Sequence, residues 1–289
     1  MFAPDIVVAA VVNGLLTGAV YALVSVALTL VYGVLHIINF AHGAILTAAM
    51  FAAFFADQAG VDPLIAAFGL APLFFALGYA AQRLVIGPAS HGADSNTLMV
   101  TLGIAILLEN AMLAAFGSDT RTIDVPYGFS SVDLGFVFLP APRVIAFAAA
   151  CLVALLLWVL LTGTDIGKAI RAVARDKLGA TLVGIDVPHI YAVTFGLGAA
   201  CLAIAACVLL PSYYVQPRAG NAYVFVAFTA VVLGGMGSVP GAMIGGLFIG
   251  VVESLGGLYF GESLGQLGVF VIFILALLLR PTGLFGARA

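Results

Sequence analysis

Apolar runs of about 20 residues recur through this 289-residue chain, and their length restricts its fold more than any other feature. A bilayer-spanning helix needs this length, whereas the strands of a membrane barrel give short alternating segments. Hydrophobic residues make up 64% of the sequence and charged residues 8%, which is too little polar surface to cover a soluble globule. We therefore predict an all-α, polytopic transmembrane bundle that forms a single domain over residues 1–289.

The bundle is expected to contain both continuous and interrupted helices. The predicted continuous spans are residues 6–31, 64–82, 98–116, 144–161, 190–210 and 264–279. Two further apolar segments, 31–56 and 223–253, are broken by polar residues or glycines and predict discontinuous helices. Alternating residues at 132–139 predict a small hairpin in the long polar connection 117–143.

The loop over residues 164–188 gathers much of the charge of the chain. Four of the ten basic residues of the whole chain lie here within ten positions: Lys168, Arg171, Arg175 and Lys177. Such a loop is expected to face the cytoplasm. Helical spacing places the first three on one face beside an apolar stripe, and Asp176 is placed to cap a second short helix. We expect two short helices joined by a bend.

Residues 163–169 superficially resemble a phosphate-binding loop. Three residues instead of four separate Gly163 from Gly167, and Ala169 stands where such a loop has Ser or Thr. We therefore predict no ATP binding by this chain.

The charged loop carries a specific resemblance to a known family. Its pattern is Gly167-x-Ala-x-Arg-Ala-x-Ala-x-Asp176, then Ala180, then Gly184-Ile-x-Val187. This resembles the cytoplasmic coupling loop of the branched-chain amino acid type of ABC importer permease, which docks into a cleft on a separate ATPase subunit. The resemblance implies a coupling role for Lys168, Arg171, Ala172, Arg175, Asp176 and Gly184. From charge alone, a solvated loop that only fixes topology is the alternative.

Two other segments are similar to signatures of the same family. The first comprises Tyr21-Ala-Leu, Val31-Tyr-Gly and Ile38-Asn-Phe-Ala-His-Gly43, where the family bends at its translocation path; the second is Gly234-Gly-Met-Gly-Ser-x-x-Gly241. Candidate pathway residues are Tyr21, His36, Asn39, His42, Glu109, Asn110, Gly235 and Gly237. For His36 and Asn39 the alternative is bonding to neighbouring backbone. We take Glu109 as a solitary intramembrane carboxylate, turned inward, protonated or paired, with a structural bond to a neighbouring helix as its alternative role.

The distribution of basic residues predicts the orientation in the membrane. Residues 1–5 lack the basic region of a cleaved signal peptide, so the first run is expected to remain as a span that starts outside. Counting crossings then places the C-terminus in the cytoplasm. The basic residues expected inside are Arg83, Lys168, Arg171, Arg175, Lys177, Arg280 and Arg288, against Arg121, Arg143 and Arg218 outside.

These observations indicate the permease subunit of a bacterial ABC importer in the inner membrane. The resemblance implies a second homologous permease subunit, two ATPase subunits that hold ATP and Mg²⁺, and a periplasmic or extracellular substrate-binding protein. We also expect the lipid bilayer as a partner, no nucleic acid, and no cofactor or metal bound by this chain. The cysteines, Cys151, Cys201 and Cys207, all lie in apolar runs, as small hydrophobes do.

The alternative is a self-contained secondary transporter or channel for a small polar solute, in which the broken segments and Glu109 would serve as sites. A membrane enzyme is disfavoured, since no paired intramembrane aspartates, His-Glu-x-x-His or Gly-x-Ser-x-Gly pattern occurs. The substrate stays open, because related permeases handle amino acids, amides, urea or small acids.

Overall fold

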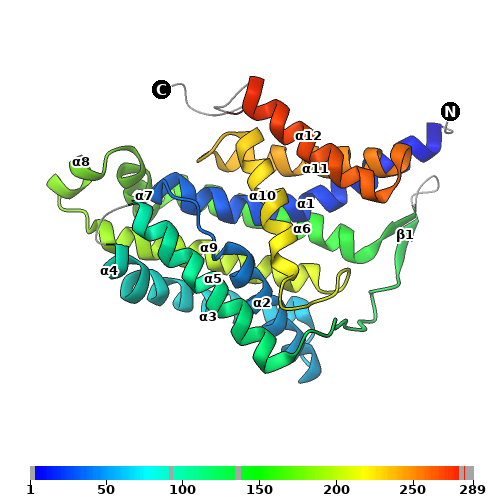
Figure 1. Cartoon of the computed structure of the whole chain (residues 1–289), viewed down its shortest axis with the longest axis horizontal. Coiled ribbons are helices and arrows are strands. Elements are labelled where there is room, and N and C mark those ends of the chain that lie inside the picture. Colours follow the sequence, from blue (N-terminus) through cyan, green and yellow to red (C-terminus); the bar gives the residue numbers. More distant parts are fainter. Residues whose placement is uncertain (1–3, 91–93, 134–137, 280–282, 284–289) are drawn as a thin grey trace.

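Helices supply nearly all the regular structure of the computed structural model, which describes residues 4–90, 94–133, 138–279 and 283 (Figure 1). They are α1 (Pro4–Leu35), α2 (His42–Gln58), α3 (Pro63–Ala80), α4 (Gly87–Ser90), α5 (Asp94–Phe116), α6 (Ala141–Gly163), α7 (Asp165–Arg175), α8 (Lys177–Leu182), α9 (Val187–Leu209), α10 (Ala219–Gly234), α11 (Val239–Phe260) and α12 (Glu262–Leu279). A π-helical segment, η1 (Ala81–Ile86), joins α3 to α4. The predicted all-α fold is confirmed.

A small antiparallel hairpin interrupts the helical pattern between α5 and α6. It consists of β1 (Ser131–Asp133) and β2 (Phe138–Pro140), in which Val132 pairs with Leu139. The hairpin predicted for residues 132–139 is thereby confirmed.

Side-chain caps fix where several helices begin. The side-chain oxygens of Thr164, Asp176, Asp186 and Ser238 accept hydrogen bonds from amides in the first turns of α7, α8, α9 and α11, respectively. Each such bond satisfies a donor that has no partner within the helix. In α9 and α11 a proline also occupies the first turn, where its missing N–H costs nothing. The predicted cap at Asp176 is confirmed.

Six helices of the described chain are long and apolar enough to cross a membrane. They are α1, the stretch from α3 to α4, α5, α6, α9 and α11, while α10 and α12 supply shorter apolar helices. The prediction that the span over residues 64–82 ends before Arg83 is wrong. Helical structure continues through η1 to Ser90. The Arg83 guanidinium forms an ion pair with Asp186 at 3.7 Å, so the helix can continue past this charged residue.

α1 and α11 lie side by side and antiparallel along a seam of glycines. A Cβ atom added at Gly14 would lie 2.7 Å from Cα of Val251, and one added at Gly18 would lie 2.8 Å from Cα of Leu247. Small residues let helix backbones approach this closely in a bilayer. Gly14 and Gly18 therefore allow close packing of α1 against α11, and Ser254 Oγ donates a 2.7 Å hydrogen bond to the Ala10 carbonyl.

α9 lies at the centre of the bundle, with most of its residues buried. Its small residues admit the neighbouring helices: a Cβ at Gly78 of α3 would lie 2.8 Å from Cβ of Ala199. Cys201 and Cys207 are buried in α9 as free thiols, whereas Cys151 on α6 is exposed.

Both predicted helix breaks are confirmed. α1 ends at Leu35, the chain turns through His36 in the left-handed region (φ 57°), and α2 begins at His42. α10 and α11 are separated by a turn in which Gly235 and Gly237 have φ of 102° and 88°, a region that favours glycine. In Figure 1, α10 runs across α1 instead of alongside it.

The bundle has two distinct ends. Figure 1 shows α7 and α8 at the left, and the strand β1 with the N-terminal end of α1 at the right. We call these the α7–α8 end and the β1–β2 end. Arg280 and Arg288, both expected inside, lie outside the described residues.

Candidate functional site

A cavity of about 890 Å³ lies among α1, α10, α11, α12 and the segment before α10. Its α1 wall is formed by Asn13, Thr17 and Tyr21, which recur every four residues and so share one face of that helix. The face continues with Ser25, whose Oγ donates to the Tyr21 carbonyl at 2.6 Å and lies 3.3 Å from the Ala227 carbonyl. Ser25 thus ties α1 to α10 just beyond the cavity.

Glu253 of α11 places a carboxylate on the cavity wall. Its Oε2 is buried and has no hydrogen-bond partner among the described residues. The Tyr21 side chain lies close enough to the same carboxylate to interact with it electrostatically. This acid was missed in the sequence, because it was taken as the end of the apolar segment 223–253, whereas α11 continues to Phe260. The view of Glu109 as a solitary intramembrane carboxylate is therefore wrong.

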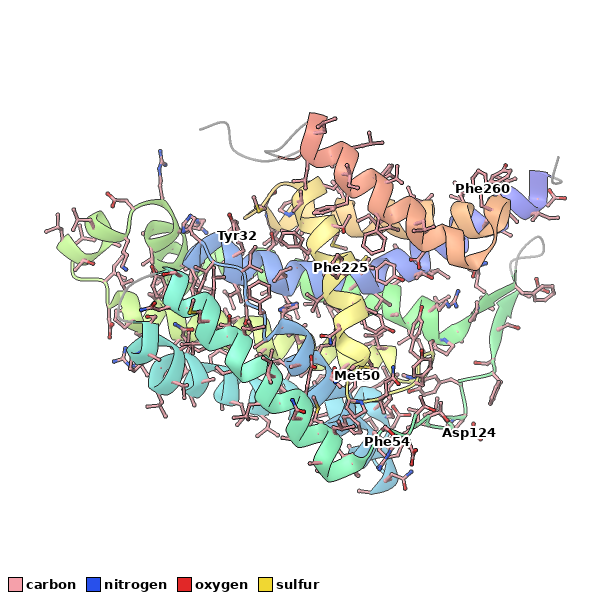
Figure 2. The ribbon with its side chains drawn as sticks, viewed as in Figure 1. Tyr32, Met50, Phe54, Asp124, Phe225 and Phe260 are labelled. Atoms are coloured by element: carbon pink, nitrogen blue, oxygen red, sulfur yellow. The ribbon has the colours of Figure 1, made fainter. Side chains whose placement is uncertain are left out.

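Three tyrosines gather around Glu253. Tyr21, Tyr213 and Tyr223 all line the cavity, with ring centroids 6.5 Å apart for Tyr21 and Tyr223 and 6.0 Å apart for Tyr213 and Tyr223. Each tyrosine side chain is close enough to Glu253 to interact with it electrostatically. Phe225, labelled on α10 in Figure 2, and Phe270 of α12 extend the wall as an aromatic pair with centroids 5.4 Å apart.

Arg143 of α6 brings a positive charge to the same cavity. Its guanidinium acts on Tyr213 electrostatically, and it forms no ion pair with Glu253 in the part of the chain that the structure describes. The cavity lining also includes Arg218, which lies 4.0 Å from Glu109, so Arg143 is the lining arginine without an ion-pair partner among the described residues.

The predicted pathway residues near the first break lie mostly elsewhere. Of them only Tyr21 lines the cavity. His42 is buried with Nε2 3.1 Å from the Val24 carbonyl, and the Asn39 side chain accepts from the Ala41 amide at 3.0 Å. His36 is exposed at the end of α1, with its ring 6.4 Å from that of Tyr32. Bonding to neighbouring backbone, the alternative given for His36 and Asn39, describes Asn39, and no such bond is found for the His36 side chain in the ranges that the structure describes. His42 also bonds to backbone, and a role of these residues in a passage stays a prediction.

Glu109 is paired, as expected. It accepts from Asn221 Nδ2 at 2.9 Å, and Arg218 Nε lies 4.0 Å from its other oxygen. These contacts join α5 to the start of α10. Asn110 instead donates to the Ile106 carbonyl of its own helix at 2.8 Å.

Gly235 and Gly237 form the turn between α10 and α11, away from the cavity wall. The Gly237 amide donates to Thr29 Oγ1 of α1 at 3.2 Å, and a Cβ at Gly33 would lie 3.1 Å from Gly237 Cα. The turn is thus fixed to the part of α1 nearest the α7–α8 end.

The predicted coupling loop forms the two short helices expected from its sequence, α7 and α8. The buried face of α7 is Gly167, Ile170 and Val173, and the last two pack in one apolar cluster with Val34 and Leu35 of α1. α7 is therefore attached to the membrane helices through its apolar side, and its basic side points away.

The basic residues and the sharp stop lie where the spacing placed them. Lys168, Arg171, Arg175 and Asp176 are exposed, Ala172 is half-buried, and Gly184 ends α8 with φ of 87°. Lys168 donates to Asp165 at 2.8 Å, and this hydrogen bond lowers the pKa of the Asp165 carboxyl. Arg171 and Arg175 have no ion-pair partner among the described residues, which leaves both guanidinium groups available.

An apolar surface on α8 accompanies these charges. Three large apolar side chains are exposed here: Leu178 at 72%, Leu182 at 79% and Val183 at 76%. The exposure of these side chains was not predicted from the sequence. Large apolar side chains gathered on an exposed loop mark an interaction surface more often than scattered ones do.

No metal-binding group of three or more His, Cys, Asp or Glu residues occurs in the described ranges. The fold and the cavity define a multi-pass α-helical membrane protein that encloses a polar cavity among its helices. From residue 10 to residue 279, the chain matches the family described as "Branched-chain amino acid transport system / permease component". The chain belongs to this family.

Relatives and a solved structure agree with that assignment. The chain is 35% identical to the high-affinity branched-chain amino acid transport system permease protein BraD of Pseudomonas aeruginosa, over 95% of this chain and 94% of that protein. It is 33% identical to LivH of Escherichia coli, with the same coverage of both chains. A chain in the structure "PsaBC from Streptococcus pneumoniae in complex with Fab" has a similar fold, with a TM-score of 0.51, 17% identity, and coverage of 94% of this chain and 92% of that one.

Proposed function

We propose that this permease moves a small amino-acid-like solute of the branched-chain class into the cytoplasm, driven by ATP hydrolysis on separate subunits. Its partners are a second homologous permease subunit, two ATPase subunits and a substrate-binding protein on the outer side. The similarity to BraD and LivH, which are named as permease proteins of high-affinity branched-chain amino acid transport systems, supports the substrate class. Glu253 is a second carboxylate within an apolar helix, and a self-contained secondary transporter could use it as a site. Family membership nevertheless favours the importer subunit.

The observation that carries the coupling role is the surface formed by α7 and α8. Arg171 and Arg175 of α7 have no ion-pair partner among the described residues. α8, which contacts α7, carries exposed Leu178 and Leu182 and is followed by exposed Val183. An apolar patch rimmed by guanidinium groups suits a cleft on a protein that offers carboxylates and an apolar floor. We infer that this surface is where the ATPase docks.

The orientation follows from the same surface. Docking of a cytoplasmic ATPase requires the α7–α8 end to face the cytoplasm, so α1 begins outside in the inner membrane and α12 ends inside. The cavity then lies toward the outer side, where a binding protein delivers solute. Closure of the two ATPases moves α7, and the packed helices respond by switching between outward-open and inward-open states.

The decisive experiment reverses the charge of Arg171. Arg171→Glu is expected to abolish uptake and release the ATPase during co-purification, because losing one partner of a desolvated interfacial pair costs about 2–5 kcal/mol. Insertion should be normal, since three basic residues remain in the loop. The measurements are membrane expression, co-purification with the ATPase and uptake of radiolabelled L-leucine in the assembled transporter.

The matched control is Asp119→Lys, a charge reversal at an exposed residue of the opposite end. Arg121 would be a poor control, because its guanidinium packs against three phenylalanine rings. Normal uptake and ATPase retention in Arg171→Glu would rule out the docking surface. ATP turnover by the isolated permease would rule out the division of labour between subunits.

A further inference from the structure

Glu253 and the three tyrosines form an arrangement suited to a cation. A carboxylate with a buried oxygen that lacks a partner faces the cavity, and three electron-rich rings stand around it. Aromatic faces attract ammonium groups within about 6 Å, and the attraction grows when water is excluded. A buried acceptor without a partner is costly, so a donor supplied by a ligand would be strongly favoured.

The donors present in the protein do not fill this role. The Tyr21 side chain interacts electrostatically with the carboxylate, but Oε2 is left without a hydrogen-bond partner among the described residues. Arg143 lines the same cavity without pairing with Glu253. The described chain also has no metal-binding cluster, and Glu253 stands among tyrosines, which disfavours a divalent metal ion as the natural occupant.

A zwitterion matches the charges of Glu253 and Arg143. Its ammonium would donate to Glu253 inside the ring of tyrosines, while its carboxylate would face the guanidinium of Arg143, a planar donor suited to carboxylates. The cavity, at about 890 Å³, has room for an aliphatic side chain beside Phe225 and Phe270. We propose that Glu253, Tyr21, Tyr213 and Tyr223 form a binding subsite for the α-ammonium group of an amino acid inside the permease. This inference rests on the proposed function and adds a recognition site within the membrane to it.

A protection experiment on the assembled transporter tests the subsite without the binding protein. Cys151, the exposed native cysteine, is replaced by Ala, and Asn13→Cys places a thiol on the cavity wall. The rate of labelling by a small aqueous thiol reagent is then measured with L-leucine, with 2-hydroxy-4-methylpentanoate, which lacks the ammonium, and with neither. L-Leucine should slow labelling, and the hydroxy acid should do so at least tenfold less effectively.

The variant Glu253→Gln removes the charge with little change of shape. It should raise the L-leucine concentration needed for half-protection by about tenfold or more, while Asp124→Asn, at an exposed acid that is not part of the cavity lining, should leave it unchanged. Equal protection by leucine and the hydroxy acid in the unmodified site would overturn the proposal even if Glu253→Gln failed to fold. So would full protection in a folded Glu253→Gln variant.

Uptake separates this inference from the proposed function. If the complete transporter with its binding protein takes up L-leucine while Glu253→Gln transports and is protected normally, only the subsite is wrong. If the complete transporter takes up no branched-chain amino acid, the proposed substrate class is wrong. Protection by L-leucine that depends on Glu253 would still establish an ammonium site in that case.

Discussion

Gly167 of α7 packs directly against the carbonyl group of Leu160 in α6, and no Cβ atom fits between them. The contact lets the chain fold back sharply where α6 ends at Gly163 and α7 begins at Asp165. It thereby sets the position of the exposed basic face relative to the membrane helices.

Gly167→Ala is expected to displace α7 and to lower uptake and ATPase co-purification, because overpacking typically costs about 1–3 kcal/mol. Gly163→Ala is the matched control, since its added Cβ meets nothing within 4 Å. Uptake and co-purification with the ATPase measure the effect. Equal behaviour of the two variants would show that this contact does not position α7.

A second prediction concerns the seam between α1 and α11. Gly18→Ala should lower the thermal unfolding temperature in detergent, since its Cβ would lie 2.8 Å from the Gly246 carbonyl oxygen and cannot be accommodated without separating the helices. Gly69→Ala, on an open face of α3, should leave the unfolding temperature unchanged or raise it slightly. An unfolding temperature that falls equally in both variants would contradict a specific seam.

Thr47 joins α2 to α10 through its hydroxyl. Oγ1 accepts from the Gly220 amide at 2.9 Å and donates to the Gly43 carbonyl at 3.0 Å. Thr47→Val keeps the shape but leaves a buried amide without a partner, so we expect a loss of about 1–3 kcal/mol in the free energy of unfolding. Thr47→Ser retains the hydroxyl and should recover most of this loss. Chemical denaturation of the purified protein distinguishes the two.

Arg121 anchors the connection between α5 and β1. Its guanidinium lies 5.5 Å from the Phe54 ring centroid and donates to the Phe116 carbonyl at 2.7 Å, while its backbone pairs with Val215. Arg121→Glu should therefore destabilise the protein, unlike Arg171→Glu, which should impair coupling at unchanged stability. Thermal unfolding separates the two, and Asp119→Lys controls for charge. A stable Arg121→Glu variant would show that these contacts contribute little.

Thiol accessibility tests which polar residues line a passage. With Cys151 replaced, Thr17→Cys should label readily because it faces the cavity, whereas Asn39→Cys should label slowly in the state described here. If the bend at residues 36–41 forms part of the path, labelling of Asn39→Cys should rise when the assembled transporter turns over ATP. Constant protection of Asn39→Cys in every nucleotide state would assign this residue to packing.

Sequence patterns determined the elements better than their arrangement. Continuous apolar runs located the spans, and Asp176 and the glycines around Gly237 marked a helix start and a turn, because these signals depend on neighbours in the chain. The extension of the third span beyond Arg83 was not predictable, since the pairing of Arg83 with Asp186 joins residues far apart in sequence.

The cavity was beyond sequence reasoning for the same reason. Tyr21 was identified as a candidate pathway residue, but Glu253 lies beside it only because the glycine seam brings α11 against α1. Arg143 joins the same cavity from α6. Ending an apolar segment at its first charge discarded Glu253. Following the small residues on to Gly257 would have kept the acid inside the helix.

α1 contacts α7 near its own C-terminal end and lines the cavity closer to its N-terminus. Val34 packs with Ile170 of α7, and Tyr21, about 20 Å away along the same uninterrupted helix, stands beside Glu253. A hydrogen-bonded helix without a break in this stretch is stiff. A displacement of α7 would therefore be transmitted along α1 to Tyr21 with little bending of the helix. In the transport cycle proposed above, movement of α7 would thus reach the proposed ammonium subsite through one continuous helix.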